Sequence, residues 1–501
     1  MGVVLRQSIK GTIITYTGAF IGFITTFFIL TSYLTTEEIG LTRVLLEVAT
    51  LLSGFSMMGM TSSIFRFFPY FKDSPDNPHC PEHGPHHGFF YYLIKVALGG
   101  ALIVIPLYLI LQAPISSFFS RNSALFNTYY YQVIPLSLCL LFWLTFELYA
   151  VQLMRIAIPK FIREILLRLL LIVVYLLYAF HHISLSVFIY LFVASYGLCM
   201  IFALIYLRSI TPLSFKHEST YITQEIKHSF FKYTGLYVVA SFGSTLASRM
   251  DLFMVSSIDS GGLNSAGIFS IAFFIVAIIE IPSRSILSIS TPGMADAMKN
   301  NDIDRVNNLY KQITLYQFFT GAIIFLLIWF NIDTIFAIIP NGHIYSQGKW
   351  VVFFLGLAKL VELTFNYGNP IVSCSKYYHW NLYYTFLVTT LSIVSNLIFI
   401  PQLGIVGAAV ATLITMSISY GVQQILISWR IKANPFSLNY FKIILLLSVV
   451  VGINFCIPFL FNKWLDLFFR SIIVIFIVTI LAYYLRVVPE FFQKIKTKRG
   501  F

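Results

Sequence analysis

The longest uncharged stretch of the sequence limits most strongly what this chain can fold into. Between Lys376 and Arg430 there is no Asp, Glu, Lys or Arg, and a second uncharged run extends from Gly11 to Thr36. About 20 consecutive apolar residues are enough to cross a bilayer as a helix. Charged residues make up 11% of the chain, against roughly 25% in soluble domains. So few charges cannot cover a soluble surface, and lipid is therefore the predicted solvent.

Apolar runs between polar or Pro- and Gly-rich breaks predict an all-α, polytopic membrane protein with about fourteen transmembrane helices. The run that begins at Gly11 exceeds the apolar core of a secretory signal, which is about 7–15 residues, and is interpreted as the first span. Near the end of the longest uncharged stretch, Pro401 is expected to end one helix and Gly404 to begin a tight turn. The predicted spans are 11–34, 42–68, 89–111, 128–153, 159–180, 184–207, 233–257, 264–290, 312–332, 350–373, 380–400, 404–429, 441–461 and 467–487.

The positions of the basic residues predict the orientation. With the N-terminus placed in the cytoplasm and the loops sorted alternately, 22 of the 33 Lys and Arg residues fall on the cytoplasmic side. Five fall on the outer side, namely Arg43, Arg121, Lys349, Lys463 and Arg470. This asymmetry follows the positive-inside rule and predicts cytoplasmic termini in a bacterial inner membrane. The net charge of +13 is thereby assigned to the membrane surface, and no nucleic-acid partner is expected.

The longest break, 209–232, divides the spans into six and eight, which permits parallel repeats. The segments TTEEIGLTRVLLEVATLL around Gly40 and GGLNSAGIFSIAFFIVAII around Gly267 both place a glycine after a short polar turn. Either duplication or ordinary helical-hairpin sequence explains this likeness. The predicted organisation is an N-terminal lobe over 1–208, a cytoplasmic linker over 209–232, a C-terminal lobe over 233–430, and two further spans with a basic tail over 431–501.

Ionisable residues inside predicted spans are candidates for function, because a charge at bilayer depth costs a few kcal/mol. Three pairs are spaced three or four residues apart and can neutralise each other on one helix face: Glu164 with Arg168, Glu280 with Arg284, and Lys359 with Glu362. Four residues lie near span ends, where long side chains reach the interface: Arg66, Lys95, Glu164 and Arg168. These explanations compete with a role in transport.

Arg249 and Asp251 need a different explanation. Residues two apart on a helix project about 200° apart, so these side chains cannot both face lipid and cannot pair well with each other. At least one is expected to point into a cavity or to meet a partner on another helix. An arginine can bind phosphate oxygens through its fork of donors, and a nearby acid offers a site for a coupling ion.

Three segments carry motifs of a known membrane-protein family. Leu5–Phe71 contains an E-x-G turn followed by a Gly-rich second helix. The segment LASRMDLFMVSSIDSGGLNSAGIFSIAF contains an Arg-x-Asp motif, and LGIVGAAVATLITMSISY contains Gly-x-x-Gly-Ala-Ala. Their order and spacing resemble the polysaccharide or O-antigen flippase branch of the multidrug/oligosaccharidyl-lipid/polysaccharide exporter superfamily. The resemblance covers nearly the whole chain in span number, loop lengths and hairpin positions.

The resemblance implies two six-helix lobes around a central cavity that opens alternately to each side, with two extra C-terminal helices. It implies translocation of undecaprenyl-diphosphate-linked oligosaccharide for surface polysaccharides such as O-antigen, lipopolysaccharide or capsule. A proton or sodium ion is the expected coupling cation, and polysaccharide polymerase machinery is a candidate partner. We assign binding of the diphosphate headgroup to Arg249, Arg284, Arg66 and Lys359. We assign ion coupling to Asp251, Glu280 and Glu362.

Two other functions compete with this one. A multidrug exporter of the same fold would be expected to have fewer basic and more acidic residues in its cavity. A polytopic polysaccharide polymerase would need a large outer loop or an acidic metal-binding loop, and no predicted loop exceeds about 25 residues. No catalytic residue and no cofactor is therefore expected.

One loop is rich in potential metal ligands. Four His and Cys80 lie within Phe71–Phe90, a composition that can bind metal. The Pro and Gly residues between Ser74 and Gly88 oppose a defined helix there. We interpret the segment as a cytoplasmic connector and predict no metal site.

Overall fold

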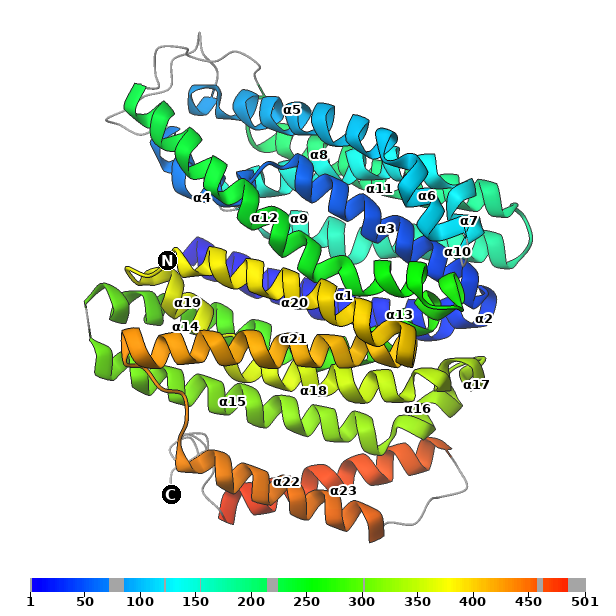
Figure 1. The fold of residues 1–501 in the computed structure, drawn as a ribbon, viewed down its shortest axis with the longest axis vertical. Coiled ribbons are helices and arrows are strands. Elements are labelled where there is room, and N and C mark those ends of the chain that lie inside the picture. The colour runs from blue at the N-terminus through cyan, green and yellow to red at the C-terminus, as the bar shows by residue number, and fades with distance from the viewer. Residues whose placement is uncertain are drawn as a thin grey trace. The chain divides into compact units, whose positions relative to one another are not determined.

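A computed structural model describes residues 2–71, 85–120, 123–153, 155–213, 224–300, 302–456 and 463–484. Within these ranges the chain is helical and contains no strand, which confirms the predicted all-α class. The chain divides into two compact units, residues 1–267 and 268–501, which Figure 1 colours from blue to green and from green to red. Residues 72–84 of the His-rich loop lie outside the described residues, whereas Pro85–Gly88, with His86 and His87, forms a 3₁₀ turn; the prediction for the loop stays a prediction.

The first unit is built from long apolar helices joined by short turns. Its α-helices are α1 (Gly2–Ile24), α2 (Thr31–Tyr33), α3 (Thr36–Ser56), α4 (Met60–Phe71), α5 (Phe89–Ile110), α6 (Gln112–Ser120), α7 (Ala124–Thr128), α8 (Val133–Gln152), α9 (Ala157–Phe161), α10 (Leu167–Ala179), α11 (Leu185–Ile210) and α12 (Gln224–Ile258). The first unit also contains two π-helical turns, η1 (Thr25–Leu30) and η4 (Ile162–Leu166), and two 3₁₀ turns, η2 (Pro85–Gly88) and η3 (Tyr130–Gln132). Helix α12 begins inside the predicted linker 209–232.

The second unit begins within α13 (Gly262–Ala277). Its further α-helices are α14 (Ile281–Lys299), α15 (Ile303–Phe330), α16 (Ile332–Ile338), α17 (Gly342–Tyr345), α18 (Lys349–Phe365), α19 (Gly368–Cys374), α20 (Trp380–Leu403), α21 (Ile405–Leu426), α22 (Leu438–Cys456) and α23 (Lys463–Tyr484). The shorter turns are η5 (Ile278–Glu280), η6 (Ser346–Gly348) and η7 (Ile427–Ile431).

Helices lie over all fourteen predicted spans, and among the described residues ten are long and apolar enough to cross a membrane. The other four have identifiable reasons for falling short. The span at 159–180 carries Lys160, Arg163, Glu164 and Arg168, and α12 also carries several charged residues. Helix α18 is 17 residues long, and α22 contributes a shorter apolar stretch, Leu438–Asn454. The chain is a multi-pass helical membrane protein.

The second span differs from its prediction at both ends. Helix α3 starts at Thr36 rather than at 42, because the Thr35 side chain and Glu38 form a capping box at its N-terminus. It stops at Ser56, where Met58 and Gly59 take positive φ angles of 48° and 72°, and the chain restarts as α4. Arg43, which the sorting of loops placed outside the membrane, therefore lies within α3.

The hairpin between α20 and α21 also differs in detail from its prediction. Pro401 does not end α20, since the helix includes it and stops at Leu403. A proline this close to a helix end removes only a late backbone hydrogen bond. Gly404 makes the turn with φ 59° and ψ −136°, a conformation that residues with a Cβ avoid. The predicted turn is confirmed at Gly404.

The same order of helix packing recurs in both units. In the first, α3 packs on α5, α5 on α8, α8 on α11, and α11 on α10. In the second, α14 packs on α15, α15 on α18, α18 on α21, and α21 on α20. These are equivalent positions in the two series of spans, the second to sixth and the eighth to twelfth. This correspondence favours repeated units over a chance likeness of two hairpins.

Helices α22 and α23 form a hairpin at the C-terminal end of the second unit (Figure 1). Arg470 on α23 binds both carboxylate oxygens of Asp466 through Nε, at 3.1 and 3.0 Å, and both side chains are almost fully buried. Asp466 also accepts a hydrogen bond of 3.1 Å from Thr334 on α16, which ties the hairpin to the rest of the unit. Arg470, placed in an outer loop from the sequence, is therefore a buried residue of α23.

Candidate functional site

The charged side chains within the described spans gather in clusters that each lie inside one unit. One joins α3 to α12, a second joins α8 to η4, α10 and α1, and a third joins η5 and α14 to α18. Apolar solvent does not drive helices together in a membrane, so polar contacts and close packing of small residues have this role. Each cluster can therefore serve to hold its helices together.

Helix α12 runs along α3 and α4 in the first unit (Figure 1). Small groups permit the close approach, since a Cβ on Gly54 would come within 2.8 Å of the Thr245 methyl group. Further along, the hydroxyls of Ser63 and Thr234 are 2.9 Å apart. The rings of Phe55 and Phe242 are in tilted contact, with centroids 4.6 Å apart. Van der Waals and hydroxyl contacts thus hold α12 against α3 and α4 at several levels.

Arg249 and Glu47 meet across this contact. Nη1 of Arg249 donates to both carboxylate oxygens of Glu47, at 2.8 and 3.0 Å. The expectation that Arg249 or Asp251 must meet a partner on another helix is confirmed for Arg249. The pair stays accessible, because the side chain of Arg249 is 39% exposed and that of Glu47 is 17% exposed. Asp251 is half-buried on the same helix.

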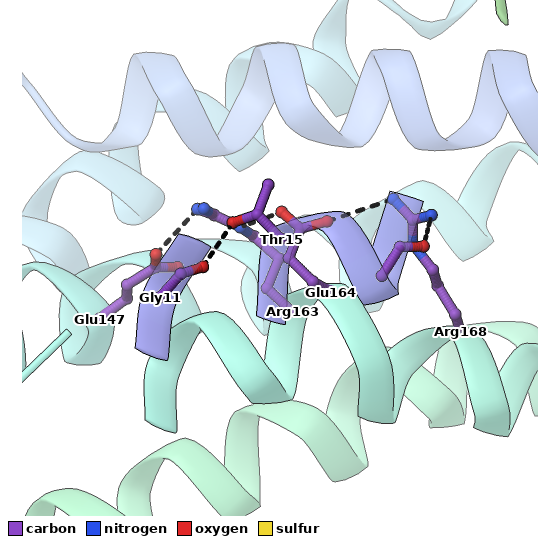
Figure 2. A network of polar contacts seen from close by, with 7 residues as sticks. Gly11, Thr15, Glu147, Arg163, Glu164 and Arg168 are labelled. Carbon is purple, nitrogen blue, oxygen red and sulfur yellow. Dashed lines mark hydrogen bonds and ion pairs between the residues drawn. The ribbon is translucent and has the colours of Figure 1, made fainter. Parts of the chain in front are cut away.

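The second cluster is a chain of alternating charges, drawn in Figure 2. Arg163 donates to Glu147 at 2.8 Å and to Glu164 at 3.4 Å, and Glu164 accepts from Arg168 at 3.2 Å. Arg168 also donates to the main-chain carbonyl of Gly18 on α1. The predicted neutralisation of Arg168 by Glu164 is confirmed.

Glycines on α1 create the room for this cluster. Gly11, Gly18 and Gly22 face Lys160, Glu164 and Arg168 respectively, which are spaced four residues apart along the opposing segment. A Cβ on Gly18 would come within 2.6 Å of the main-chain oxygen of Glu164, and one on Gly22 would overlap the Arg168 guanidinium. The cluster therefore docks α1 against η4 and α10, and we interpret it as structural.

The third cluster joins four of the predicted site residues in the second unit. Lys359 donates to Glu362 at 2.7 Å and to Glu280 at 3.0 Å, while Arg284 donates to Glu280 at 3.2 Å. Both pairs predicted from spacing are confirmed, and Lys359 adds a link between α18 and η5. Arg284 is 61% exposed and Lys359 is 18% exposed. Lys359 is thus a largely buried cation that links Glu280 to Glu362, whereas Arg284 is mostly exposed.

Two remaining candidates are placed less fully. Arg66 lies in α4, which the structure describes as a helix over Met60–Phe71, and its side chain is outside the described part. Lys95 is exposed on α5, with its ammonium 5.8 Å from the centre of the Tyr91 ring. The interfacial interpretation of Lys95 agrees with this exposure. The predicted assignment of Arg66 stays a prediction.

Solved structures show what the chain is similar to, whereas no family model matches the sequence and no characterised relative was found by sequence. The chain is similar to the lipid II flippase MurJ in an inward closed conformation, with a TM-score of 0.75, 16% identity, and coverage of 95% of this chain and 99% of that one. It is also similar to MATE multidrug resistance transporters of the MOP superfamily. The inward-facing one gives a TM-score of 0.60 at 14% identity over 84% of this chain and 98% of that one. The outward-facing one gives 0.55 at 14% identity over 86% and 95%.

At such identities the likeness concerns the fold. The chain has a polytopic helical fold similar to that of the MurJ and MATE structures. These similar structures belong to transporters rather than enzymes.

Proposed function

We propose that this chain is a flippase that moves undecaprenyl-diphosphate-linked oligosaccharide across the bacterial inner membrane by alternating access. The observation that carries the proposal is the likeness to a lipid II flippase over 95% of the chain. The resemblance of the Leu5–Phe71, Arg249 and Gly404 segments to polysaccharide flippases narrows the cargo to precursors of surface polysaccharides, such as O-antigen or capsule.

The diphosphate headgroup is the part of the substrate that these residues can bind. It carries concentrated negative charge, which arginine recognises through paired donors. Arg249 and Arg284 keep 39% and 61% of their side chains exposed although each has a carboxylate partner, so both can be reached by an anion. We assign them the main contacts, with Lys359 and Arg66 as supporting cations. The lipid tail can remain in the bilayer.

Ion coupling is proposed at the acids beside these cations, Asp251, Glu280 and Glu362. Glu280 and Glu362 share the ammonium of Lys359, at 3.0 and 2.7 Å. A proton or sodium ion bound by either acid would weaken its interaction with Lys359. The cation would then be available to the headgroup, which links ion binding to substrate binding.

The proposed topology places both termini in the cytoplasm, following the distribution of basic residues. The proposed lobes are 1–208 and 233–430, with 209–232 as a linker and 431–501 as the C-terminal addition. Polysaccharide polymerase machinery is the proposed consumer of the translocated units.

Export of drugs or organic cations is the second candidate, because the fold is also that of MATE transporters. The cations Arg249, Arg284 and Lys359 favour an anionic substrate over a cationic one. The likeness to the MATE structures is also lower by TM-score, 0.60 against 0.75.

Deletion of the gene tests the proposal in a strain with no second flippase. Lipid-linked glycan is expected to accumulate on the cytoplasmic leaflet, with recovery on complementation by the wild-type chain but not by Arg249→Ala. Normal glycan export in the deletion strain would contradict the proposal, whereas recovery with Arg249→Ala would remove only the site assignment.

A further inference from the structure

The ion pair of Glu47 and Arg249 differs from the buried ion pair of the C-terminal hairpin. Asp466 and Arg470 are 3% and 2% exposed, and Thr334 supplies a further hydrogen bond to the carboxylate. By contrast, Arg249 is 39% exposed, and both of its bonds to Glu47 start from the single nitrogen Nη1. A guanidinium has five N–H donors, so a second anion can approach Nε and Nη2 while Glu47 is still bound.

The contact between α3 and α12 does not depend on this pair. Gly54 packs on Thr245, the rings of Phe55 and Phe242 are in tilted contact, and on the following helix α4 the hydroxyl of Ser63 is 2.9 Å from that of Thr234 on α12. These contacts continue the helix interface beyond the pair. An accessible ion pair beside an interface already packed in this way is better explained by a role in exchange with another charged group.

We propose that Glu47 is an internal competitor for the substrate headgroup: its carboxylate occupies Arg249 in the unloaded protein and is displaced by the diphosphate. This inference rests on the proposed function and specifies how the same site is regulated. A carboxylate and a phosphate offer the guanidinium the same kind of ligand, two oxygens that accept charge-assisted hydrogen bonds. The diphosphate carries the greater charge and replaces the carboxylate when it arrives.

The competition gives the site a means of release. An arginine without a counter-ion at membrane depth would hold a multiply charged headgroup strongly, because the surrounding dielectric is low. Glu47 on the facing helix lowers the net free energy gained when the headgroup binds Arg249, since the ion pair of Glu47 with Arg249 must then be broken. When Glu47 returns to Arg249, the headgroup is expelled. Glu47 is therefore a positioning residue that sets substrate affinity.

The test measures binding of undecaprenyl diphosphate to the full-length protein in lipid nanodiscs, alongside flipping in proteoliposomes. Glu47→Gln keeps the shape of the side chain but removes its charge, and is expected to bind the lipid about tenfold more tightly while flipping it more slowly. Arg249→Gln is expected to bind it at least tenfold more weakly. Glu164→Gln is the matched control, because Glu164 is an equally exposed, ion-paired glutamate of the first unit and is expected to leave the affinity unchanged.

Unchanged or weaker binding by Glu47→Gln would overturn the inference, and so would a gain of the same size in Glu164→Gln. If Glu47→Gln does not fold, Glu47→Asp is used, whose shorter side chain loosens the pair and is expected to give a smaller gain in affinity. No gain in a folded Glu47→Asp would also overturn it. Absence of binding by the wild-type chain would instead refute the proposed function itself.

Discussion

Gly40 and Gly267 pack reciprocally at the crossing of α3 and α13. A Cβ on Gly40 would overlap the main-chain carbonyl oxygen of Leu263, and a Cβ on Gly267 would overlap that of Thr36. Leu263 lies four residues before Gly267, and Thr36 lies four residues before Gly40. The two contacts are therefore equivalent, as a local two-fold relation requires. The Thr36 hydroxyl also donates to Asn264 at 2.6 Å. The two sequence segments that suggested duplication are therefore joined at equivalent positions.

Alanine at either glycine is predicted to destabilise the crossing. The opposing groups are main-chain atoms that cannot move independently, so we expect a loss of about 1–3 kcal/mol for Gly40→Ala or Gly267→Ala. Thermal unfolding in detergent measures the loss. Because both changes open the same contact, the double variant is expected to lose less than the sum of the two.

Gly99→Ala is the control for this prediction. Nothing lies within 4 Å of the position of its Cβ, and alanine favours a helix over glycine by about 1 kcal/mol. It is expected to be neutral or slightly stabilising. Equal losses at Gly99 and Gly40 would show that the crossing is not the reason for the effect.

The buried pair of Asp466 and Arg470 is predicted to anchor the C-terminal hairpin. Asp466→Asn removes the buried negative charge that Arg470 binds, which costs about 3–5 kcal/mol. The double variant Asp466→Leu with Arg470→Leu is expected to be more stable than either single change, because no charge then remains buried. Unfolding of the purified protein measures the order of stability among the variants. An Asp466→Asn variant as stable as the wild-type chain would contradict the anchoring role.

The docking of α1 is predicted to be sensitive at Gly18 and tolerant at Gly11. Alanine at Gly18 places its Cβ 2.6 Å from both the main-chain oxygen and the Cβ of Glu164, whereas at Gly11 the nearest atom is in the flexible Lys160 side chain at 3.4 Å. We expect a loss of about 1–3 kcal/mol for Gly18→Ala and little change for Gly11→Ala. The same thermal measurement separates them, and a reversed order would disprove the packing argument.

Lys359 is predicted to have a structural effect that can be separated from transport. Lys359→Gln leaves the carboxylate of Glu362 without its cation, so folding and transport should both suffer. The double variant Lys359→Gln with Glu362→Gln removes the unpaired charge, and its yield of folded protein is expected to recover. Transport in the deletion strain is expected to stay low in the double variant, because Lys359 and Glu362 are both proposed to act in transport; full recovery would assign both residues to structure alone.

The features that the sequence predicted correctly depend on local pattern. Helical class and positions follow from runs of apolar residues, and the pairs of Glu280 with Arg284 and Lys359 with Glu362 follow from spacing along one helix. The pair of Asp466 and Arg470 has the same spacing and was missed, because the sorting of loops had assigned Arg470 to the outside. The capping box at Thr35 and Glu38 would likewise have placed Arg43 in a helix.

The pairings between distant segments could not be predicted. Glu47 and Arg249 are 202 residues apart in the sequence, and Lys359 and Glu280 are 79 apart. Residue type and helical periodicity indicated that Arg249 needs a partner, but the choice of partner depends on which helices cross and at what height. That information resides in packing at positions such as Gly54 and Thr245.

Translocation by the purified protein tests the central claim most directly. Proteoliposomes would contain a fluorescent undecaprenyl-diphosphate oligosaccharide, and a membrane-impermeant quencher would report the fraction exposed on the outer leaflet over time. We predict that the wild-type chain equilibrates the lipid between leaflets and that Arg249→Gln does so at least tenfold more slowly, at equal amounts of folded protein. A wild-type rate equal to that of protein-free liposomes would contradict the account.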